Sequence, residues 1–198
     1  MQNIQFPLEF KFIITTFSND FIARDANGIV VAYIKQKMFK FIEDINVYTD
    51  ESKKNIDYNI KADSWLDFSA AYNMTNHLGN HVGKIVRKGW ASIWKARYEI
   101  YDENNQQDLQ IQEENAWVKV MDALLCEIPI LGIISGYFFN PSYIVARPDG
   151  TILARLKKEP SFWGRKFSLN TLSKFEKGEE ERLVLGLMMM ILLERSRG

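Results

Sequence analysis

Basic residues gather between positions 84 and 97, and they are Lys84, Arg87, Lys88, Lys95 and Arg97. Clustered lysine and arginine donors are the groups that bind phosphate, and the planar guanidinium of arginine can hold a phosphate through two hydrogen bonds. The segment also fits a solvated strand face, because Glu99 and Asp102 follow closely and charge runs usually mark solvated surface. Two alternatives follow: an anion-binding site, or an ordinary charged strand face.

Other residue types that could carry chemistry lack the partners that the chemistry needs. His77 and His81 are four residues apart, a spacing at which two histidines on a helix can bind the same metal ion. The Leu-Gly-Asn between them predicts a turn instead, and no nearby cysteine offers a third ligand. Neither Cys126 nor Ser135 lies in a recognisable nucleophile motif. The sequence therefore predicts no catalytic residue, no metal site, no cofactor and no enzyme activity.

The composition is that of one soluble globular domain. A length of 198 residues suits a single domain spanning residues 1–198, and 46% hydrophobic with 25% charged residues is ordinary for such a domain. The net charge of +0 argues against nucleic-acid binding, which usually shows a basic balance. One cysteine and a start without a signal-peptide pattern indicate a reducing compartment. We expect a cytoplasmic protein, free or peripheral to a membrane.

The segment from Glu179 to Arg195 predicts a helix that is apolar on every side. The run from Leu183 to Leu193 is interrupted only by Gly186, leucine and methionine favour helix, and the charges at the two ends suit the helix dipole. Such a helix has to be buried all round. The apolar run falls short of the roughly 20 residues that span lipid. We therefore expect a core helix that the rest of the chain encloses, and no transmembrane span.

Upstream of the helix, the sequence has the pattern of short strands separated by turns. Turn-forming pairs such as Asn27-Gly28 and Asp149-Gly150 bound many of the runs. Residues 65–74 alternate weakly, residues 116–125 predict one or two helical turns, and residues 127–131 predict an extended segment. The predicted strands are Phe10–Phe17, Phe21–Arg24, Ile29–Ile34, Ile45–Tyr48, Ile56–Ala62, Val82–Lys88, Ser92–Tyr101, Leu109–Gln112, Tyr137–Phe139, Tyr143–Arg147, Thr151–Lys157 and Phe162–Leu169.

Helix and strands together predict an all-β fold with one helix: a closed antiparallel barrel of about twelve strands around the buried C-terminal helix. A helix with its side chains is about 10–12 Å wide, and the interior of a barrel widens with strand number, so roughly twelve strands can enclose one helix. A mid-helix glycine costs about 1 kcal/mol relative to alanine. Gly186 therefore marks either a close contact, for example with an aromatic side chain of the wall, or a glycine that is merely tolerated.

Segments over nearly the whole chain share a pattern with a known family. They are Phe39–Asp44, Ile60–Asp63, Arg87–Gly89, Ser92–Ala96, Lys95–Asp102, Glu127–Gly132, Pro160–Phe162, Gly164–Phe167 and the tail Met188–Gly198. These segments resemble the LURP-one-related family of the tubby C-terminal-like superfamily, to which the phospholipid scramblases are related. The resemblance implies a twelve-stranded barrel around a central hydrophobic helix, which agrees with the pattern of helix and strands.

The resemblance also implies a function, because tubby domains bind phosphoinositide head groups through basic residues on a hairpin. The segment Gly83–Arg87, followed by Lys95–Asp102, is similar to that hairpin, and Lys84 matches the tubby lysine through its Gly-Lys context. Arg87 is offset by one residue from the arginine expected after that lysine. Because strand side chains alternate between faces, this offset turns Arg87 away from Lys84 unless a bulge restores it.

The leading expectation is a non-catalytic module that binds phosphoinositide or another anionic lipid head group at a membrane surface. Its ligand-binding residues would be Lys84, Arg87, Lys88, Lys95 and Arg97. Two alternatives stay open. One is a protein-interaction or scaffold domain without lipid affinity. The other is a scramblase-like lipid activity, although the palmitoylation and calcium segments of the scramblases are not recognisable in this sequence.

Overall fold

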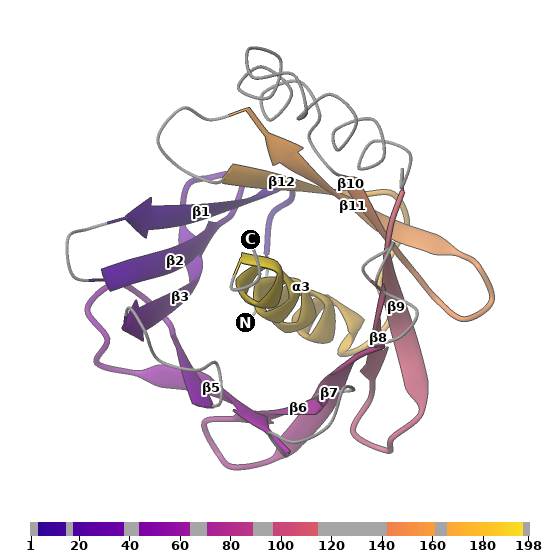
Figure 1. Cartoon of the computed structure of the whole chain (residues 1–198), viewed down its shortest axis with the longest axis horizontal. Coiled ribbons are helices and arrows are strands. Elements are labelled where there is room, and N and C mark those ends of the chain that lie inside the picture. Colours follow the sequence, from indigo (N-terminus) through magenta and orange to yellow (C-terminus); the bar gives the residue numbers. More distant parts are fainter. Residues whose placement is uncertain are drawn as a thin grey trace, which may run out of the picture.

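In the computed structural model, twelve antiparallel strands form a closed barrel around a C-terminal helix (Figure 1). The structure describes residues 4–14, 18–37, 44–63, 71–88, 97–114, 142–160 and 166–195. The elements are β1 (Leu8–Ile14), β2 (Ser18–Arg24), β3 (Val30–Lys37), β4 (Asp44–Tyr48), β5 (Ile56–Ala62), β6 (Ala71–Asn76), β7 (His81–Arg87), β8 (Arg97–Tyr101), β9 (Gln107–Glu113), β10 (Ser142–Ala146), β11 (Ile152–Glu159), β12 (Lys166–Thr171) and α3 (Glu179–Arg195). The predicted fold, a closed barrel of about twelve strands around the helix, is confirmed.

Each strand pairs with its neighbours in the chain, and β1 pairs with β12 to close the ring. Leu8, Phe10 and Phe12 of β1 are almost fully buried, because alternate side chains of a strand point to the lumen. At the closure, Leu8 lies opposite Leu169 and Phe10 lies opposite Phe167. The ring therefore closes through buried apolar side chains as well as through backbone hydrogen bonds.

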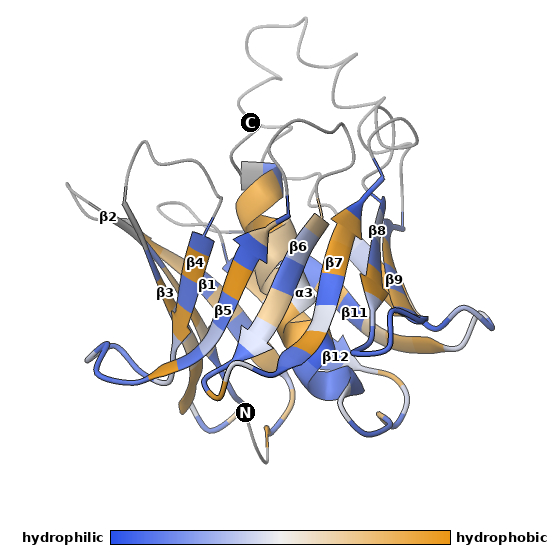
Figure 2. Ribbon diagram, turned by 90° about the horizontal axis from the view of Figure 1, so that it is seen from below, coloured by the Kyte–Doolittle hydropathy of each residue, from blue (hydrophilic) through white to orange (hydrophobic). Residues whose placement is uncertain are grey.

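The end of the barrel at which α3 begins carries five tight hairpin turns, which lie at the lower end in Figure 2. In each turn the first residue accepts a hydrogen bond from the N–H of the fourth, and the fourth has a positive φ; the fourth residues are Gly28, Lys53, Gly79, Asn105 and Gly150. Glycine adopts this conformation at no steric cost, and asparagine at a low one. In four of the turns, the side chain of the first residue accepts a hydrogen bond from the backbone N–H two residues later. These first residues are Asp25, Asp50, Asn76 and Asp102.

The helix α3 fills the lumen, and every residue from Leu183 to Leu193 is buried. A Cβ atom built on Gly186 would overlap the Cδ1 atom of Ile100, and it would lie 3.1 Å from Cγ1 of Ile100 and 3.7 Å from Cδ1 of Ile85. Of the two alternatives for Gly186, the structure therefore shows the close contact. The wall residues that make it are isoleucines of β7 and β8 rather than an aromatic residue.

Buried ion pairs hold the first turn of α3 to the wall. Arg147 donates to both oxygens of the Glu179 carboxylate, at 2.7 and 2.8 Å. One helical turn later, Arg182 donates to Asp108 at 2.6 Å. Burial alone would raise the pKa of Glu179, but its hydrogen bonds and the charge of Arg147 outweigh burial and lower it. These contacts fix how far the helix enters the barrel and which way it is rotated.

The bounds of several strands differ from the sequence prediction. β5 has the predicted bounds, whereas β1 begins earlier than the predicted strand 10–17 and β12 ends later than the predicted strand 162–169. The predicted end at 15–17 and the predicted start at 162–165 lie outside the described residues. In β12, Asn170 and Thr171 pair with residues of β11, so the partner strand rather than local propensity sets the end. The helical turns predicted at 116–125, the extended segment at 127–131 and the strand at 137–139 lie outside the described residues.

Candidate functional site

Of the candidate basic residues, Lys84 and Arg87 lie on β7, Lys88 directly follows it and Arg97 begins β8. The side chains of these strands alternate between the lumen and the outer surface. On β7, Ile85 and Arg87 are buried while Lys84 is only half-buried. The register from Lys84 to Arg87 runs opposite β8 without interruption, so no bulge intervenes. The one-residue offset therefore places Arg87 on the lumen side and Lys84 on the outer side, as strand alternation requires.

Glu99 is the centre of the outer cluster. Its carboxylate lies 2.9 Å from Nζ of Lys88 and 3.7 Å from the guanidinium of Arg97, and it accepts a hydrogen bond of 2.7 Å from the hydroxyl of Tyr101. Burial would raise the pKa of the Glu99 carboxyl, but the hydrogen bonds from Lys88 and Tyr101 outweigh burial and lower it. The same hydrogen bond raises the pKa of Lys88. Glu99 is therefore ionised at neutral pH and orders the cations around it.

Lys84 belongs to the same outer face. Its ammonium nitrogen lies 5.1 Å from the centre of the Tyr101 ring, and Tyr101 is its cross-strand partner on β8. This is within the range of a cation–π contact, which orients a lysine without neutralising it. We call Lys84, Lys88, Arg97, Glu99 and Tyr101 the β7–β8 outer cluster.

The outer cluster keeps both charge and hydrogen-bond donors for a ligand. It contains three cations and one carboxylate, a net charge of two positive. A lysine ammonium has three N–H donors and an arginine guanidinium has five, and Glu99 takes only part of them. Lys88 and Arg97 have side chains that are 40% and 46% exposed. The arrangement can therefore offer several charge-assisted hydrogen bonds to one anionic group.

Arg87 lies on the lumen side and makes contacts within the barrel. Its Nε atom donates to the hydroxyl of Tyr98 at 3.2 Å, and Tyr98 in turn donates to Glu194 of α3 at 2.6 Å. Burial and the charge of Glu194 raise the pKa of Tyr98, so it stays protonated as a donor. This chain of contacts ties the last turn of α3 to β7 and β8. Arg87 is therefore a structural residue and does not share the outer face with Lys84.

Lys95, the fifth candidate, lies outside the described residues. The sequence prediction missed the central role of Glu99 and the part played by Tyr101. A signal was present, since Arg97, Glu99 and Tyr101 alternate along one strand and so share a face. Asp102, the other acid near the cluster, instead caps the turn after β8.

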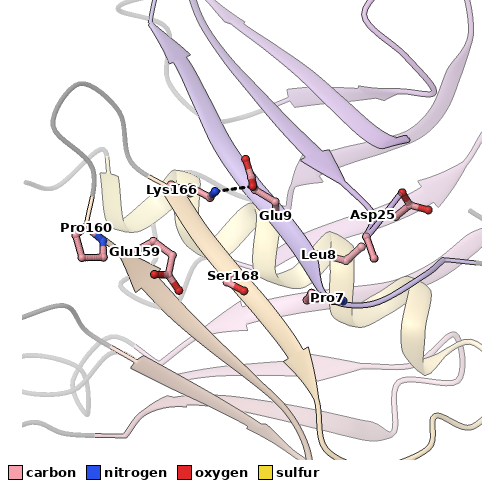
Figure 3. Close-up of a pocket in the computed structure, with 9 residues that line it drawn as sticks. Pro7, Leu8, Glu9, Asp25, Glu159, Pro160, Lys166 and Ser168 are labelled. Atoms are coloured by element: carbon pink, nitrogen blue, oxygen red, sulfur yellow. Dashed lines mark ion pairs between the residues drawn. The ribbon is translucent and has the colours of Figure 1, made fainter. Parts of the chain in front are cut away.

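A surface groove of about 420 Å³ lies on the opposite wall, over β1, β11 and β12. Figure 3 shows Lys166 facing Glu9 across neighbouring strands, and their charged atoms are 2.6 Å apart. The groove is lined by Pro7, Leu8, Glu9, Asp25, Ala26, Glu159, Pro160, Lys166 and Ser168. Three carboxylates against one lysine make it repel anions, so it is not the place for a phosphate group.

The two histidines do not form part of a metal centre with other described residues. His77 lies 3.9 Å from Asp57, and both histidine side chains are exposed. Within the described ranges, no group of three or more His, Cys, Asp or Glu side chains is arranged to hold a metal ion. In the same part of the chain, no helix has the length and apolar character to cross a bilayer.

With the barrel, its helix and the outer cluster defined, the chain can be compared with known proteins. The model of the LURP-one-related family matches residues 16–191, which include most of the barrel and the helix. The chain belongs to the LURP-one-related family. This LURP-one-related barrel is also similar to the X-ray structure of a protein from Arabidopsis thaliana, with a TM-score of 0.50 and 10% identity over 98% of this chain and 93% of the other. That likeness shows the shared fold. No curated protein matches the chain.

Proposed function

We propose that this barrel is a non-catalytic module whose β7–β8 outer cluster binds the phosphorylated or anionic head group of a membrane lipid. The observation that supports it is the convergence of Lys84, Lys88 and Arg97 on one outer face around a single carboxylate. A cluster with a net charge of two positive attracts an anionic surface, and the exposed donors supply hydrogen bonds to a phosphate. Because Glu99 already engages two of the cations, the binding should be weak and sensitive to salt.

Vesicle co-sedimentation tests this proposal. Binding is measured to phosphatidylcholine vesicles, to the same vesicles with a few mole per cent of phosphoinositide, and to a third set of vesicles. In the third set, phosphatidylserine supplies the same total negative charge as the phosphoinositide. Each cation near an anionic surface contributes about 1 kcal/mol, so Lys84→Ala and Arg97→Ala should each weaken binding about fivefold. Lys157→Ala is the matched control, because Lys157 is exposed on β11 at a distant part of the wall. Equal weak binding to all vesicles by all variants would end the proposal.

A second function is favoured by a different observation, at the end of the barrel that carries the tight turns. Ile29, Leu78 and Leu172 are 61%, 71% and 52% exposed there. They lie beside three separate connections, β2–β3, β6–β7 and β12–α3, and offer apolar contacts to a partner protein that covers this end. Partner binding that survives high salt and is lost in Leu78→Glu, but not in Lys84→Ala, would favour a protein-interaction domain over a lipid-binding one.

A further inference from the structure

The β7–β8 outer cluster has a carboxylate at its centre, which a site for a bare anion does not need. The side chain of Glu99 is 10% exposed, and its carboxylate lies 2.9 Å from Nζ of Lys88. Burial raises its pKa, but the hydrogen bonds from Lys88 and Tyr101 outweigh burial and lower it, so Glu99 stays ionised. A negative charge in this place repels a phosphate group unless the ligand also makes a favourable contact with it.

The two oxygens of the Glu99 carboxylate have different surroundings. Oε2 accepts a hydrogen bond of 2.7 Å from the hydroxyl of Tyr101 and is the oxygen that lies 2.9 Å from Lys88. Oε1 lies 3.7 Å from Nη2 of Arg97, which is beyond hydrogen-bond distance. Within the described part of the chain, no donor makes a hydrogen bond to Oε1. An ionised carboxylate can accept several hydrogen bonds, so Oε1 can accept one from a ligand.

Arg97 places hydrogen-bond donors beside this acceptor. Its Nη2 atom donates to the side chain of Gln110 at 3.5 Å, and Gln110 is the cross-strand partner of Glu99 on β9. Among the described residues, this contact and the one to Glu99 use one nitrogen of the guanidinium. The side chain of Arg97 is 46% exposed, so its other N–H groups can reach a ligand. An acceptor and several donors therefore lie side by side on the outer face.

We propose that Glu99 is a specificity-determining residue, which selects head groups that carry a hydroxyl on the carbon beside the phosphate. This inference rests on the proposed function of the outer cluster and adds the class of ligand: a phosphorylated polyol, such as an inositol phosphate, rather than a bare phosphate ester. The phosphate accepts hydrogen bonds from Arg97 and Lys88, and the neighbouring hydroxyl donates one to Oε1 of Glu99. A bare phosphate ester leaves Oε1 facing a second negative charge without a donor.

Vesicles of matched charge test this selection. Phosphatidylcholine vesicles carry either phosphatidylinositol monophosphate or phosphatidic acid, at contents that give the same total negative charge. Both lipids have a phosphate monoester, and the first alone has ring hydroxyls. Because a hydrogen bond to a charged group is worth about tenfold in affinity, wild-type protein should bind the phosphoinositide vesicles about tenfold more strongly. Equal binding to the two would overturn the selection and leave the proposed function standing, whereas binding to neither would overturn both.

Glu99→Gln identifies the residue responsible. Because Lys88 can only donate, the glutamine oxygen takes the place of Oε2 and the NH2 group takes the place of Oε1, so a donor replaces the acceptor. The variant should bind both kinds of vesicle more strongly, through its added positive charge, but its preference should fall to about twofold or less. Glu9→Gln is the matched control, because it frees a lysine, Lys166, on the opposite wall. A preference that is retained in Glu99→Gln, or lost equally in Glu9→Gln, would overturn the role of Glu99.

Soluble competitors test the same contact without a variant. Inositol monophosphate and methyl phosphate are phosphate monoesters of equal charge, and the inositol ester alone has hydroxyls beside its phosphate. Inositol monophosphate should displace wild-type protein from phosphoinositide vesicles at about one tenth of the concentration of methyl phosphate. Equal potency of the two competitors, or displacement by neither from vesicles that do bind the protein, would overturn the selection by hydroxyl groups.

Discussion

The contact at Gly186 allows a quantitative test of how closely the helix fits the barrel. Gly186→Ala gains about 1 kcal/mol of helix propensity. The added Cβ overlaps Cδ1 of Ile100, and overpacking of a well-packed core costs about 1–3 kcal/mol. We therefore expect Gly186→Ala to be between neutral and about 2 kcal/mol destabilising. Ile100→Val alone removes the overlapping atom of the wall and should cost about 0.5–1.5 kcal/mol.

In the Ile100→Val background the sign of the Gly186→Ala effect should reverse, because the propensity gain remains and the main overlap is gone. The two changes should therefore couple by about 1–3 kcal/mol, well above the error of a double-mutant cycle. Urea unfolding of the four proteins, followed by circular dichroism, measures this coupling. Additive effects to within about 0.5 kcal/mol, with unchanged urea dependence, would refute the close packing of the helix against the wall at this point.

Three further predictions concern the polar ends and the apolar middle of α3. Glu179→Gln should cost about 1.5–3 kcal/mol at pH 7 because it removes the nearer carboxylate of Arg147 and leaves only Glu176, at 3.5 Å. Since the pKa of Glu179 is lowered in the folded state, this difference in unfolding free energy should shrink as pH falls below 4.5. Tyr98→Phe should cost about 1.5–3 kcal/mol in denaturant unfolding, because it removes the donor to Glu194. Met189→Asp should prevent cooperative folding, because an unpaired charge replaces a fully buried side chain; a sharp thermal transition in that variant would contradict the enclosed helix.

The helix and the closed barrel could be predicted because their signals are local and strong. An apolar run that only Gly186 interrupts, and that is too short for a bilayer, has to be enclosed by protein. The turn pairs Asn27-Gly28 and Asp149-Gly150 mark hairpins by their own backbone chemistry. The limits of β1 and β12 could not be predicted in the same way. They depend on which residues meet at the closure of the ring, more than 150 residues apart in the chain.

The candidate site was predictable only where it follows strand periodicity. Alternation separates Lys84 from Arg87, and it gathers Arg97, Glu99 and Tyr101 on one face. The structural role of Arg87 depends on its hydrogen bond to Tyr98, which in turn donates to Glu194. Tyr98 and Glu194 are 96 residues apart in the chain. No local pattern indicates such a contact. The sequence therefore identifies which residues carry charge, and tertiary structure decides which of them remain available for a ligand.

The order of elements along the chain has a consequence for biosynthesis. The wall strands leave the ribosome first, and the element that fills the lumen follows all twelve of them. At a typical rate of about 5–20 residues per second, the earliest strands wait on the order of ten seconds or more with their apolar faces uncovered. The nascent chain should therefore depend on chaperones through most of its synthesis, and it should acquire its final form only after residues 183–193 have emerged.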